Sequence, residues 1–164
     1  VYLSSLGFIK INISNGFKNE GSIKKNGKEP EQLTDTNTAP DADKKILQKC
    51  KQQLDEYFSG KRKIFDLPIY QEGTGFQQKV WEELIQIPYG KTITYLQLAQ
   101  RMGNIKSIRT AAAANGLNRV WIIVPCHRVI GSDGRLPCYA VGLPMKKWLL
   151  VHESEYANVF PLLF

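Results

Sequence analysis

Long apolar runs are missing from this sequence of 164 residues. No stretch approaches the roughly 20 apolar residues that a membrane-spanning helix needs, so we expect no membrane segment. The first residues lack the basic segment followed by an apolar one that marks a secretory signal, which favours a cytoplasmic protein. Hydrophobic residues make up 43% of the chain and charged residues 23%, an ordinary balance that argues against wholesale disorder.

Cysteine and histidine are scarce. Three cysteines cannot all pair with one another, and with only two histidines they form no CxxC or other recurrent spacing of metal ligands. We therefore expect neither a disulfide-bonded scaffold nor a metal site, and at least one thiol must stay free. Cys50 is expected in the core and His152 at the surface.

Acidic residues are scarce in one part of the chain. The formal net charge is +7, from 22 Lys and Arg against 15 Asp and Glu. From Lys91 to Lys147, nine basic residues stand against a single acid, Asp133. Such a segment in a folded region favours a polyanion such as nucleic acid, although a basic surface that serves only solubility fits the charge equally well.

The first part of the chain, residues 1–70, is expected to form a small αβ support domain. Residues 6–13 alternate loosely between apolar and polar, as a strand does. Residues 15–43 are rich in Asn, Lys, Gly, Glu, Thr and Pro, a composition typical of a long mobile loop.

A helix and a short strand should complete this first domain. Apolar residues recur at helical spacing from Ile46 to Phe58, and Gly60 would end the helix. Ile64, Leu67 and Ile69 then suggest a short strand, which Pro68 would confine to the edge of a sheet because proline has no N–H to donate.

The second part, residues 71–164, is expected to form a mainly helical domain. Two helices should begin at capping boxes, in which Thr74 is followed by Gln77 and Thr94 by Gln97. On the first of these helices we expect the buried face to comprise Phe76, Val80, Trp81, Leu84 and Ile85.

A third helix should run from Ile108 to about Asn115, with Ser107 as its N-cap and Gly116 as its C-terminal signal. With the preceding helix and a turn that contains Gly103, this Ala-rich helix in a basic segment predicts a helix-turn-helix. The fold class is therefore α+β: a small N-terminal αβ domain with a β-sheet, and a C-terminal, mainly helical, winged helix-turn-helix domain.

Four consecutive alanines, Ala111 to Ala114, lie in that third helix. An isolated run of alanines indicates a well-packed helix with small side chains. Small side chains also let a helix approach a nucleic-acid groove closely, and Arg109 at the start of the helix could reach into a duplex. The two interpretations are compatible.

A short apolar run, Trp121–Val124, predicts a buried strand or extended segment that leads to Cys126. A lone Cys after such a run is most often a buried, unreactive thiol. Here His127 and Arg128 follow it, and either favours a thiolate. Because adjacent side chains on an extended chain point in opposite directions, a Cys–His pair needs a bend or a bridging water. Glu153 could orient His127 and complete a base-assisted nucleophile.

These residues resemble the O6-alkylguanine-DNA alkyltransferases, also called methylated-DNA–protein-cysteine methyltransferases. The active-site motif of that family is similar to Pro-Cys-His-Arg-Val at residues 125–129. The resemblance covers residues 54–153 and is weak before them. Further motifs agree in order and spacing: Gly-Thr-Gly-Phe-Gln at 73–77, Val-Trp at 80–81, Ile-Pro-Tyr-Gly-Lys-Thr at 87–92, Tyr95, Leu-Ala at 98–99, Asn-Gly-Leu-Asn at 115–118, Gly142, Leu143, Lys146, Leu149, Leu150 and Glu153.

By this resemblance, Cys126 would accept the alkyl group of O6-methylguanine, and also that of O4-methylthymine, in DNA. His127, held by Glu153, would take the thiol proton through a water, and Tyr95 would protonate or hydrogen-bond the leaving base. Asn118 would hold the bend that joins the helix-turn-helix to the active-site segment. The stable thioether implies a single turnover that consumes the protein, and no cofactor is needed because the protein is itself the acceptor.

The partner that the resemblance implies is double-stranded DNA, contacted in the minor groove with the damaged nucleotide flipped out of the stack. Arg109 would fill the gap that the flipped nucleotide leaves. We expect no membrane partner and a monomeric protein. The other predicted DNA contacts are Ser107, Thr110, Ala111 and Arg128.

The predicted substrate pocket departs from the family pattern. Members usually carry a Gly-rich loop that ends in Tyr-Ser-Gly-Gly-Leu, whereas this sequence has Tyr139, Ala140 and Val141 before Gly-Leu. Ala140 lacks a hydroxyl that could donate to the base, and Val141 adds bulk. We therefore expect methyl adducts to be accepted better than benzyl adducts. Cys138, beside this loop, is expected to be an ordinary loop thiol.

Three other functions are compatible with parts of the sequence. A binding-only alkyltransferase-like protein would mark lesions for other repair factors, but such proteins typically replace the reactive cysteine, and Cys126 is present. A transcription regulator would leave the Cys-His-Arg motif unexplained. An unrelated cysteine hydrolase would not need a basic helix-turn-helix.

Overall fold

The structure is a computed structural model that describes residues 2–3, 9–10, 41–136, 139 and 142–158. It starts with an antiparallel pair, β1 (Tyr2–Leu3) and β2 (Ile9–Lys10), in which Leu3 is the partner of Ile9. The strand β2 lies within the segment predicted to be extended. The predicted loop lies outside the described residues as far as residue 40.

The first helix, α1 (Asp41–Phe58), begins earlier than the apolar pattern indicates. Residues 41–43, which we assigned to the loop, are helical, so the prediction is wrong there. The apolar pattern does not extend to these residues, so it could not place the start of the helix. Cys50 is fully buried, as predicted.

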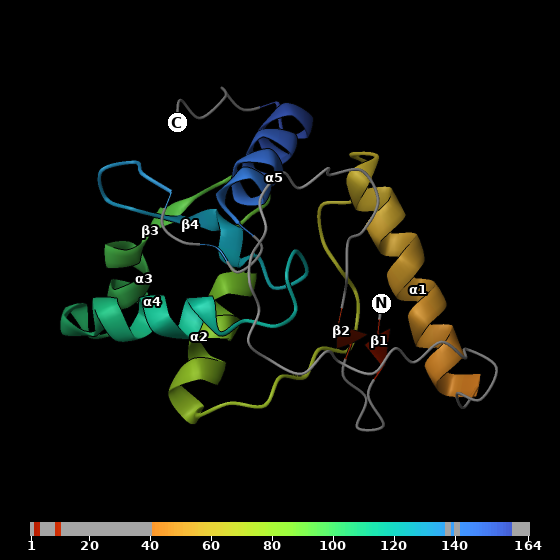
Figure 1. Cartoon of the computed structure of the whole chain (residues 1–164), viewed down its shortest axis with the longest axis horizontal. Coiled ribbons are helices and arrows are strands. Elements are labelled where there is room, and N and C mark those ends of the chain that lie inside the picture. Colours follow the sequence, from red (N-terminus) through yellow and green to blue (C-terminus); the bar gives the residue numbers. More distant parts are fainter. Residues whose placement is uncertain (1, 4–8, 11–40, 137–138, 140–141, 159–164) are drawn as a thin grey trace.

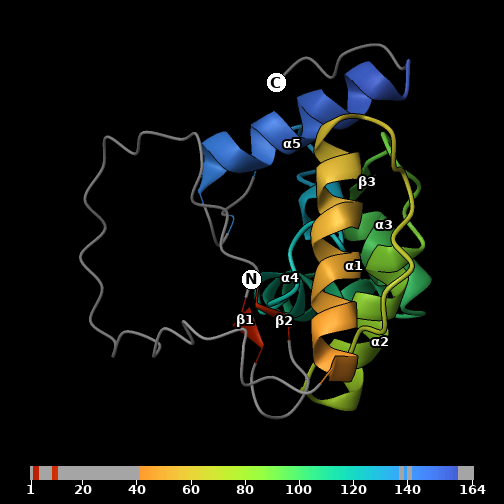
Figure 2. The ribbon, with the colours of Figure 1, turned by 90° about the vertical axis from the view of Figure 1, so that its right-hand side faces the viewer.

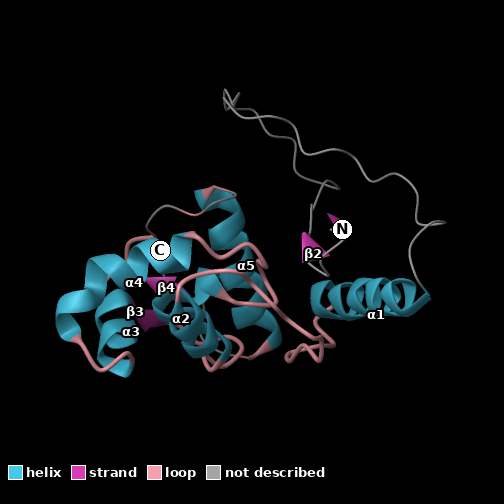
Figure 3. Cartoon of the chain, turned by 90° about the horizontal axis from the view of Figure 1, so that it is seen from below, coloured by secondary structure: helices cyan, strands magenta, loops and turns pink. Residues whose placement is uncertain are grey.

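The remaining elements form a mainly helical group around a two-stranded parallel sheet (Figure 1). In the sheet, Ile93 is the partner of Val129 and Thr94 of Ile130. Figure 3 shows that helices make up most of the described chain and that α1 lies to one side of the others. The elements are α2 (Gly75–Ile85), β3 (Ile93–Thr94), α3 (Tyr95–Arg101), the 3-10 turn η1 (Ile105–Ser107), α4 (Ile108–Gly116), the 3-10 turn η2 (Cys126–Arg128), β4 (Val129–Ile130) and α5 (Leu143–Tyr156).

Both predicted capping boxes are confirmed. At the start of α2, the Gln77 amide N–H donates to the Thr74 hydroxyl over 3.3 Å, and the Thr74 N–H donates to the Gln77 side chain over 2.8 Å. Thr94 and Gln97 repeat the pattern at α3 over 3.1 and 2.7 Å. Each box satisfies two backbone donors that the helix leaves without partners, which fixes where the helix begins.

The core lies where α2 packs against α4. The indole N–H of Trp81 donates to the Ala114 carbonyl over 2.9 Å, and Val80 and Leu84 are fully buried beside it. Ile85, predicted on the same face, is 46% exposed, because it lies about 100° further round the helix than Leu84.

No strand forms at Ile64–Ile69, so that prediction is wrong. The side-chain amide of Gln53 on α1 accepts from the Asp66 N–H over 2.9 Å and donates to the Asp66 carbonyl over 3.1 Å. The amide thus satisfies the backbone groups that a neighbouring strand would have paired. Ile64 is 79% exposed, so its apolar side chain does not mark a buried face.

The predicted helix from Ile108 is confirmed as α4 and Ser107 occupies its N-cap position, but neither predicted end signal acts as expected. Ser107 makes no capping hydrogen bond, because its hydroxyl donates to the Asn104 carbonyl over 2.6 Å and its backbone belongs to η1. Gly116 is the last residue of the helix, and Leu117 follows it in a right-handed helical conformation. Between α3 and α4, Gly103 has a left-handed backbone, with φ of +76°.

Helix α5 joins α1 to the rest of the molecule, and Figure 2 shows it crossing the C-terminal end of α1. His152 on α5 is buried, and its Nε2–H donates to the Tyr57 carbonyl over 2.9 Å. Its ring stacks on Trp148 at a centroid distance of 4.9 Å. The prediction that His152 lies at the surface is therefore wrong, since its partner comes from a helix 95 residues earlier.

Candidate active site

The segment that leads to Cys126 is a buried turn rather than a strand. The Val124 N–H donates to the Val120 carbonyl over 2.9 Å, which closes the turn on itself. Ile122, at its centre, has φ of +73° and is 1% exposed. A β-branched residue rarely adopts this left-handed conformation, which costs about 1–3 kcal/mol, so the surrounding structure must hold it.

Asn118 holds this turn at both ends. Its side-chain NH₂ donates to the Val124 carbonyl over 2.8 Å, and its side-chain oxygen accepts from the Val120 N–H over 3.0 Å. Asn118 is itself 3% exposed, so its amide has no water to compete for these bonds. The turn, rather than the expected extended chain, delivers Cys126 to the interior.

Cys126 is 2% exposed and lies at the start of η2. A 3-10 turn has three residues per turn, so the side chains of Cys126, His127 and Arg128 diverge in three directions instead of alternating. Burial raises the pKa of the Cys126 thiol, and the adjacent Asn118 and Tyr139 side chains lower it only in part. The thiol is therefore protonated at neutral pH, and the expectation of a thiolate favoured by its neighbours is wrong for the resting protein.

His127 is fully buried and lies 2.8 Å from Glu153, measured from Nε2 to Oε1. Glu153 is ionised, so Nε2 carries the proton and donates it. Burial lowers the pKa of His127, and the carboxylate of Glu153 offsets this only in part. Nδ1 is buried and has no hydrogen-bond partner among the described residues. The ring is thus a neutral base whose free lone pair is on Nδ1.

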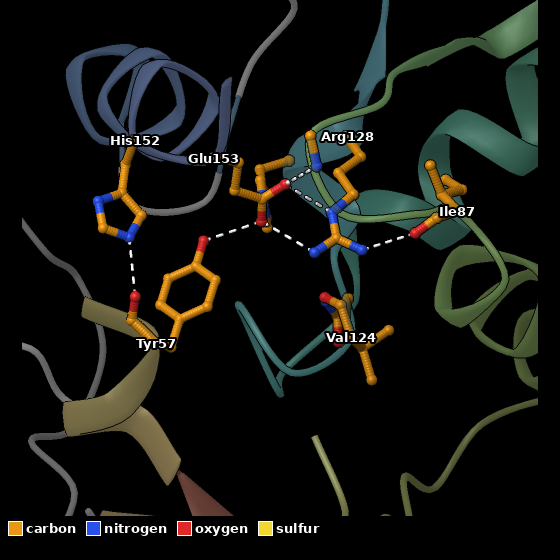
Figure 4. A network of polar contacts seen from close by, with 9 residues as sticks. Tyr57, Ile87, Val124, Arg128, His152 and Glu153 are labelled. Carbon is orange, nitrogen blue, oxygen red and sulfur yellow. Dashed lines mark hydrogen bonds and ion pairs between the residues drawn. The ribbon is translucent and has the colours of Figure 1, made fainter. Parts of the chain in front are cut away.

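Glu153 receives donors from several parts of the chain (Figure 4). Arg128 reaches its two oxygens through Nε and Nη2 over 2.8 and 2.9 Å, the Gly90 N–H donates over 3.1 Å and the Tyr57 hydroxyl over 2.9 Å. Burial alone would raise the pKa of Glu153. The hydrogen bonds from His127 and Arg128, together with the positive charge of Arg128, instead hold it well below the usual range.

Arg128 is the first of three predicted DNA contacts that the structure corrects. Its side chain is buried, and Nη1 donates to the Ile87 carbonyl over 2.6 Å while the rest of the guanidinium binds Glu153. A guanidinium that is buried and hydrogen-bonded to Glu153 cannot contact DNA. Ala111 is 0% and Ser107 8% exposed, because both face the protein core, whereas Arg109 and Thr110 are exposed.

Tyr95 and Tyr139, two further predicted site residues, are half-buried near Cys126. The side-chain NH₂ of Asn115 donates to the Tyr95 hydroxyl over 3.3 Å and to the Cys126 carbonyl over 3.5 Å, which places Tyr95 beside the active-site turn. Burial raises the pKa of Tyr139, as does the adjacent Cys126. Ala140, Val141 and Cys138 lie outside the described residues.

Three residues at this site were not recognised from the sequence as functional. Asn115 and Lys146 belong to motifs that support the resemblance, which was the available signal for them. Lys146 is fully buried, and its ammonium group donates to the Val129 carbonyl over 2.6 Å. Tyr57 was expected only as part of an apolar helix face, and nothing in its local sequence marks its hydroxyl.

Two of the nine basic residues between Lys91 and Lys147 are buried. Arg128 and Lys146 are buried, and the other seven basic residues of this segment are exposed.

Across the described residues, no group of three or more His, Cys, Asp or Glu side chains could hold a metal ion. No helix in the described part of the chain is long and apolar enough to cross a membrane.

The internal position of Arg128 gives a testable consequence for stability. Replacing Arg128 by Ala leaves the Glu153 charge buried without its strongest partner, and we expect the free energy of unfolding to fall by about 3–5 kcal/mol. Urea unfolding at pH 7 measures this. Arg119→Ala removes an exposed basic side chain and should change stability by less than about 0.5 kcal/mol. An Arg128→Ala variant as stable as the Arg119→Ala control would contradict the assignment.

Comparison with known proteins identifies the family. Residues 75–155 match the family model described as 6-O-methylguanine DNA methyltransferase, DNA binding domain, and residues 7–71 match the ribonuclease-like domain of the same family. The chain is 49% identical over 112 residues to the methylated-DNA–protein-cysteine methyltransferase of Methanosarcina barkeri, covering 68% of this chain and 71% of that protein. It is 51% identical over 94 residues to the constitutive enzyme of that name from Bacillus subtilis, covering 57% of each.

A solved structure agrees. The crystal structure of Mycobacterium tuberculosis O6-methylguanine methyltransferase superposes with a TM-score of 0.65 at 42% sequence identity, covering 67% of each chain. The resemblance of the active-site motif, the α+β fold and the family matches therefore agree, and the chain belongs to the 6-O-methylguanine DNA methyltransferase family.

Proposed function

We propose that this protein repairs DNA directly, by irreversible transfer of the methyl group of O6-methylguanine to the sulfur of Cys126. The observation that carries the proposal is a buried, protonated thiol on the same 3-10 turn as a neutral histidine that an ionised glutamate orients. A related structure of the Mycobacterium tuberculosis protein, 42% identical with a TM-score of 0.62, is described as a complex with DNA. This supports DNA as the partner here.

The reaction couples one proton transfer to one substitution. The Cys126 proton passes to Nδ1 of His127 through a water, and the sulfur attacks the methyl carbon in line with the bond to guanine O6. The S–C bond forms as the C–O bond breaks, and the guanine leaves with the electron pair. Tyr95 either donates a hydrogen bond to the leaving base or gives it a proton. The proton held by His127 is then returned, to the base or to Tyr95, so that the net result is one proton lost by the thiol and one gained by guanine. The thioether is stable, so each molecule reacts once.

Asn118 and Glu153 act in this scheme as positioning residues. Asn118 fixes the turn through two backbone contacts at 2.8 and 3.0 Å, and so determines where the sulfur lies. Glu153 selects the His127 tautomer with a free Nδ1. Both act without touching the substrate, which is consistent with their burial.

The DNA-binding unit in this proposal is a winged helix-turn-helix formed by α3, the turn with η1, and α4. Arg109 and Thr110 are exposed at the start of α4, where they can enter the minor groove, and Arg109 fills the space of the flipped nucleotide. Flipping is needed because a thiol that is 2% exposed cannot reach a base inside the stack. In this scheme residues 71–164 form the DNA-binding domain and residues 1–70 support it.

The same chemistry extends the proposal to O4-methylthymine. Its methyl group is also attached to an exocyclic oxygen of the base, and the base is again a stable leaving group. Tyr139 forms part of the substrate pocket, next to the thiol. We propose that a monomer suffices, because the methyl acceptor Cys126, the base His127 and its partner Glu153 all come from one chain. A binding-only role, the alternative considered above, would leave the Cys126–His127–Glu153 arrangement without a purpose.

The proposal is tested by incubating the protein with a duplex that contains one O6-methylguanine and measuring peptide masses. We expect the Cys126 peptide to gain the mass of one CH₂ group, in a yield of one methyl per protein molecule. The matched unmethylated duplex and the Cys126→Ser variant should give no gain. Tight binding to the methylated duplex without a mass change would instead favour the binding-only role.

The place of Arg109 is tested separately by comparing two substrates. If Arg109 fills the gap left by the flipped nucleotide, Arg109→Ala should slow methyl transfer from duplex by about tenfold or more, which corresponds to the few kcal/mol of unstacking. Transfer from a short single strand should change by less than about twofold, because no stack is opened.

Arg101→Ala is the matched control, since Arg101 is an exposed basic residue at the end of α3. Arg101→Ala should weaken duplex binding through loss of charge alone, and it should reduce the slope of binding affinity against salt concentration. It should not slow methyl transfer from duplex more than transfer from a single strand. Equal slowing of Arg109→Ala on both substrates would rule out the gap-filling role.

A further inference from the structure

We propose that Tyr57 on α1 is a positioning residue for methyl transfer, which acts through Glu153 on His127. The inference rests on the proposed function, since it concerns the same proton transfer. If so, the first part of the chain does more than support the fold, because it donates a hydrogen bond directly to Glu153, the partner of His127.

The hydroxyl of Tyr57 donates to Oε1 of Glu153 over 2.9 Å. That oxygen also accepts Nε2–H of His127 over 2.8 Å and Nη2–H of Arg128 over 2.9 Å. Figure 4 shows the phenol directed at the carboxylate from the side of α1. One oxygen of Glu153 therefore accepts hydrogen bonds both from the proposed base, His127, and from Tyr57, which precedes Glu153 by 96 residues.

Tyr57 is held in this orientation at both ends. Its side chain is fully buried, and its backbone carbonyl accepts the hydrogen bond from His152 over 2.9 Å. Tyr57 thus binds two successive residues of α5, one through its backbone and one through its hydroxyl. The ring packs against Phe65 and Tyr89 at centroid distances of 5.6 and 5.9 Å, which restricts its rotation.

The chemical consequence follows from sharing one acceptor. Each donor to Oε1 draws electron density from it and makes it a weaker acceptor for the others. Without the Tyr57 hydroxyl, Oε1 would bind the His127 N–H more strongly and stabilise the protonated ring. The pKa of His127 would then rise, and less of the neutral base would be present at a given low pH.

Other ionisable groups surround this pair, and the test has to separate Tyr57 from them. Burial raises the pKa of Tyr57 first, followed by the charge of Glu153, so its hydroxyl remains a donor across the working pH range. The titratable and charged groups that face Glu153 and His127 are Tyr57 from α1, Tyr89, Cys126 and Arg128 from the turns, Tyr139, and Lys146 from α5.

The experiment measures the rate of methyl transfer from the methylated duplex as a function of pH for the full-length chain. In Tyr57→Phe, we expect the acid limb of the profile to move to higher pH by about half a unit to one unit, and the plateau rate to fall about threefold to tenfold. The variant should fold, because Oε1 keeps His127 and Arg128 as donors and no buried acceptor loses all its partners.

Tyr89→Phe is the matched control. The Tyr89 hydroxyl is buried near the same carboxylate but has no hydrogen-bond partner among the described residues. Its removal should leave the acid limb in place and the plateau rate within about twofold.

A second variant gives a shift of opposite sign. Site-specific incorporation of 3-fluorotyrosine at position 57 makes the phenol a stronger donor, so the acid limb should move to lower pH. A lower thermal midpoint for Tyr57→Phe with an unmoved acid limb would assign Tyr57 a purely structural role and overturn the inference. An unmoved limb in both variants overturns it as well.

Failure of the proposed function would look different. If the unaltered protein transfers no methyl group to Cys126, the proposed function fails. If it transfers the group and Tyr57→Phe has the same pH profile, the role of Tyr57 alone fails.

Discussion

An ionised carboxylate that is almost fully buried is stable only if donors replace the water that it has lost, and Glu153 depends on this exchange. Its two oxygens accept five hydrogen bonds, from α1, from the turn before β3 and from η2. Because α5 carries Glu153, the same carboxylate ties α5 to each of those segments. The fold and the proposed proton-transfer residues Cys126, His127 and Glu153 therefore share one group, and a change at either affects the other.

The state of the thiol follows from the same arrangement. Burial lowers the pKa of His127, and Glu153 raises it only in part, since the same carboxylate is also paired with Arg128. Because burial raises the pKa of its thiol and the neighbouring base is neutral, Cys126 keeps its proton. In the proposed reaction, the thiolate forms only as the sulfur attacks the substrate, which would limit side reactions of a thiol that reacts once.

The sequence predicted the features that depend on local hydrogen bonds. The capping boxes at Thr74 and Thr94 form within four residues. The expected contact between His127 and Glu153 is also present. The orientation of Arg128 could not be predicted, because its partner lies 25 residues away on α5. Distant partners also decided the burial of His152 and the hydroxyl contact of Tyr57, where periodicity indicates a buried face but not what the polar atom binds.

Before reaction, the Cys126 thiol is protonated and the His127 ring is neutral, with the proton of the ring on Nε2. Nitrogen NMR of the His127 side chain in labelled protein at pH 7 tests this protonation state most directly. We predict a neutral ring that is protonated at Nε2 and unprotonated at Nδ1. A ring protonated on both nitrogens, together with a thiolate at Cys126, would contradict the account.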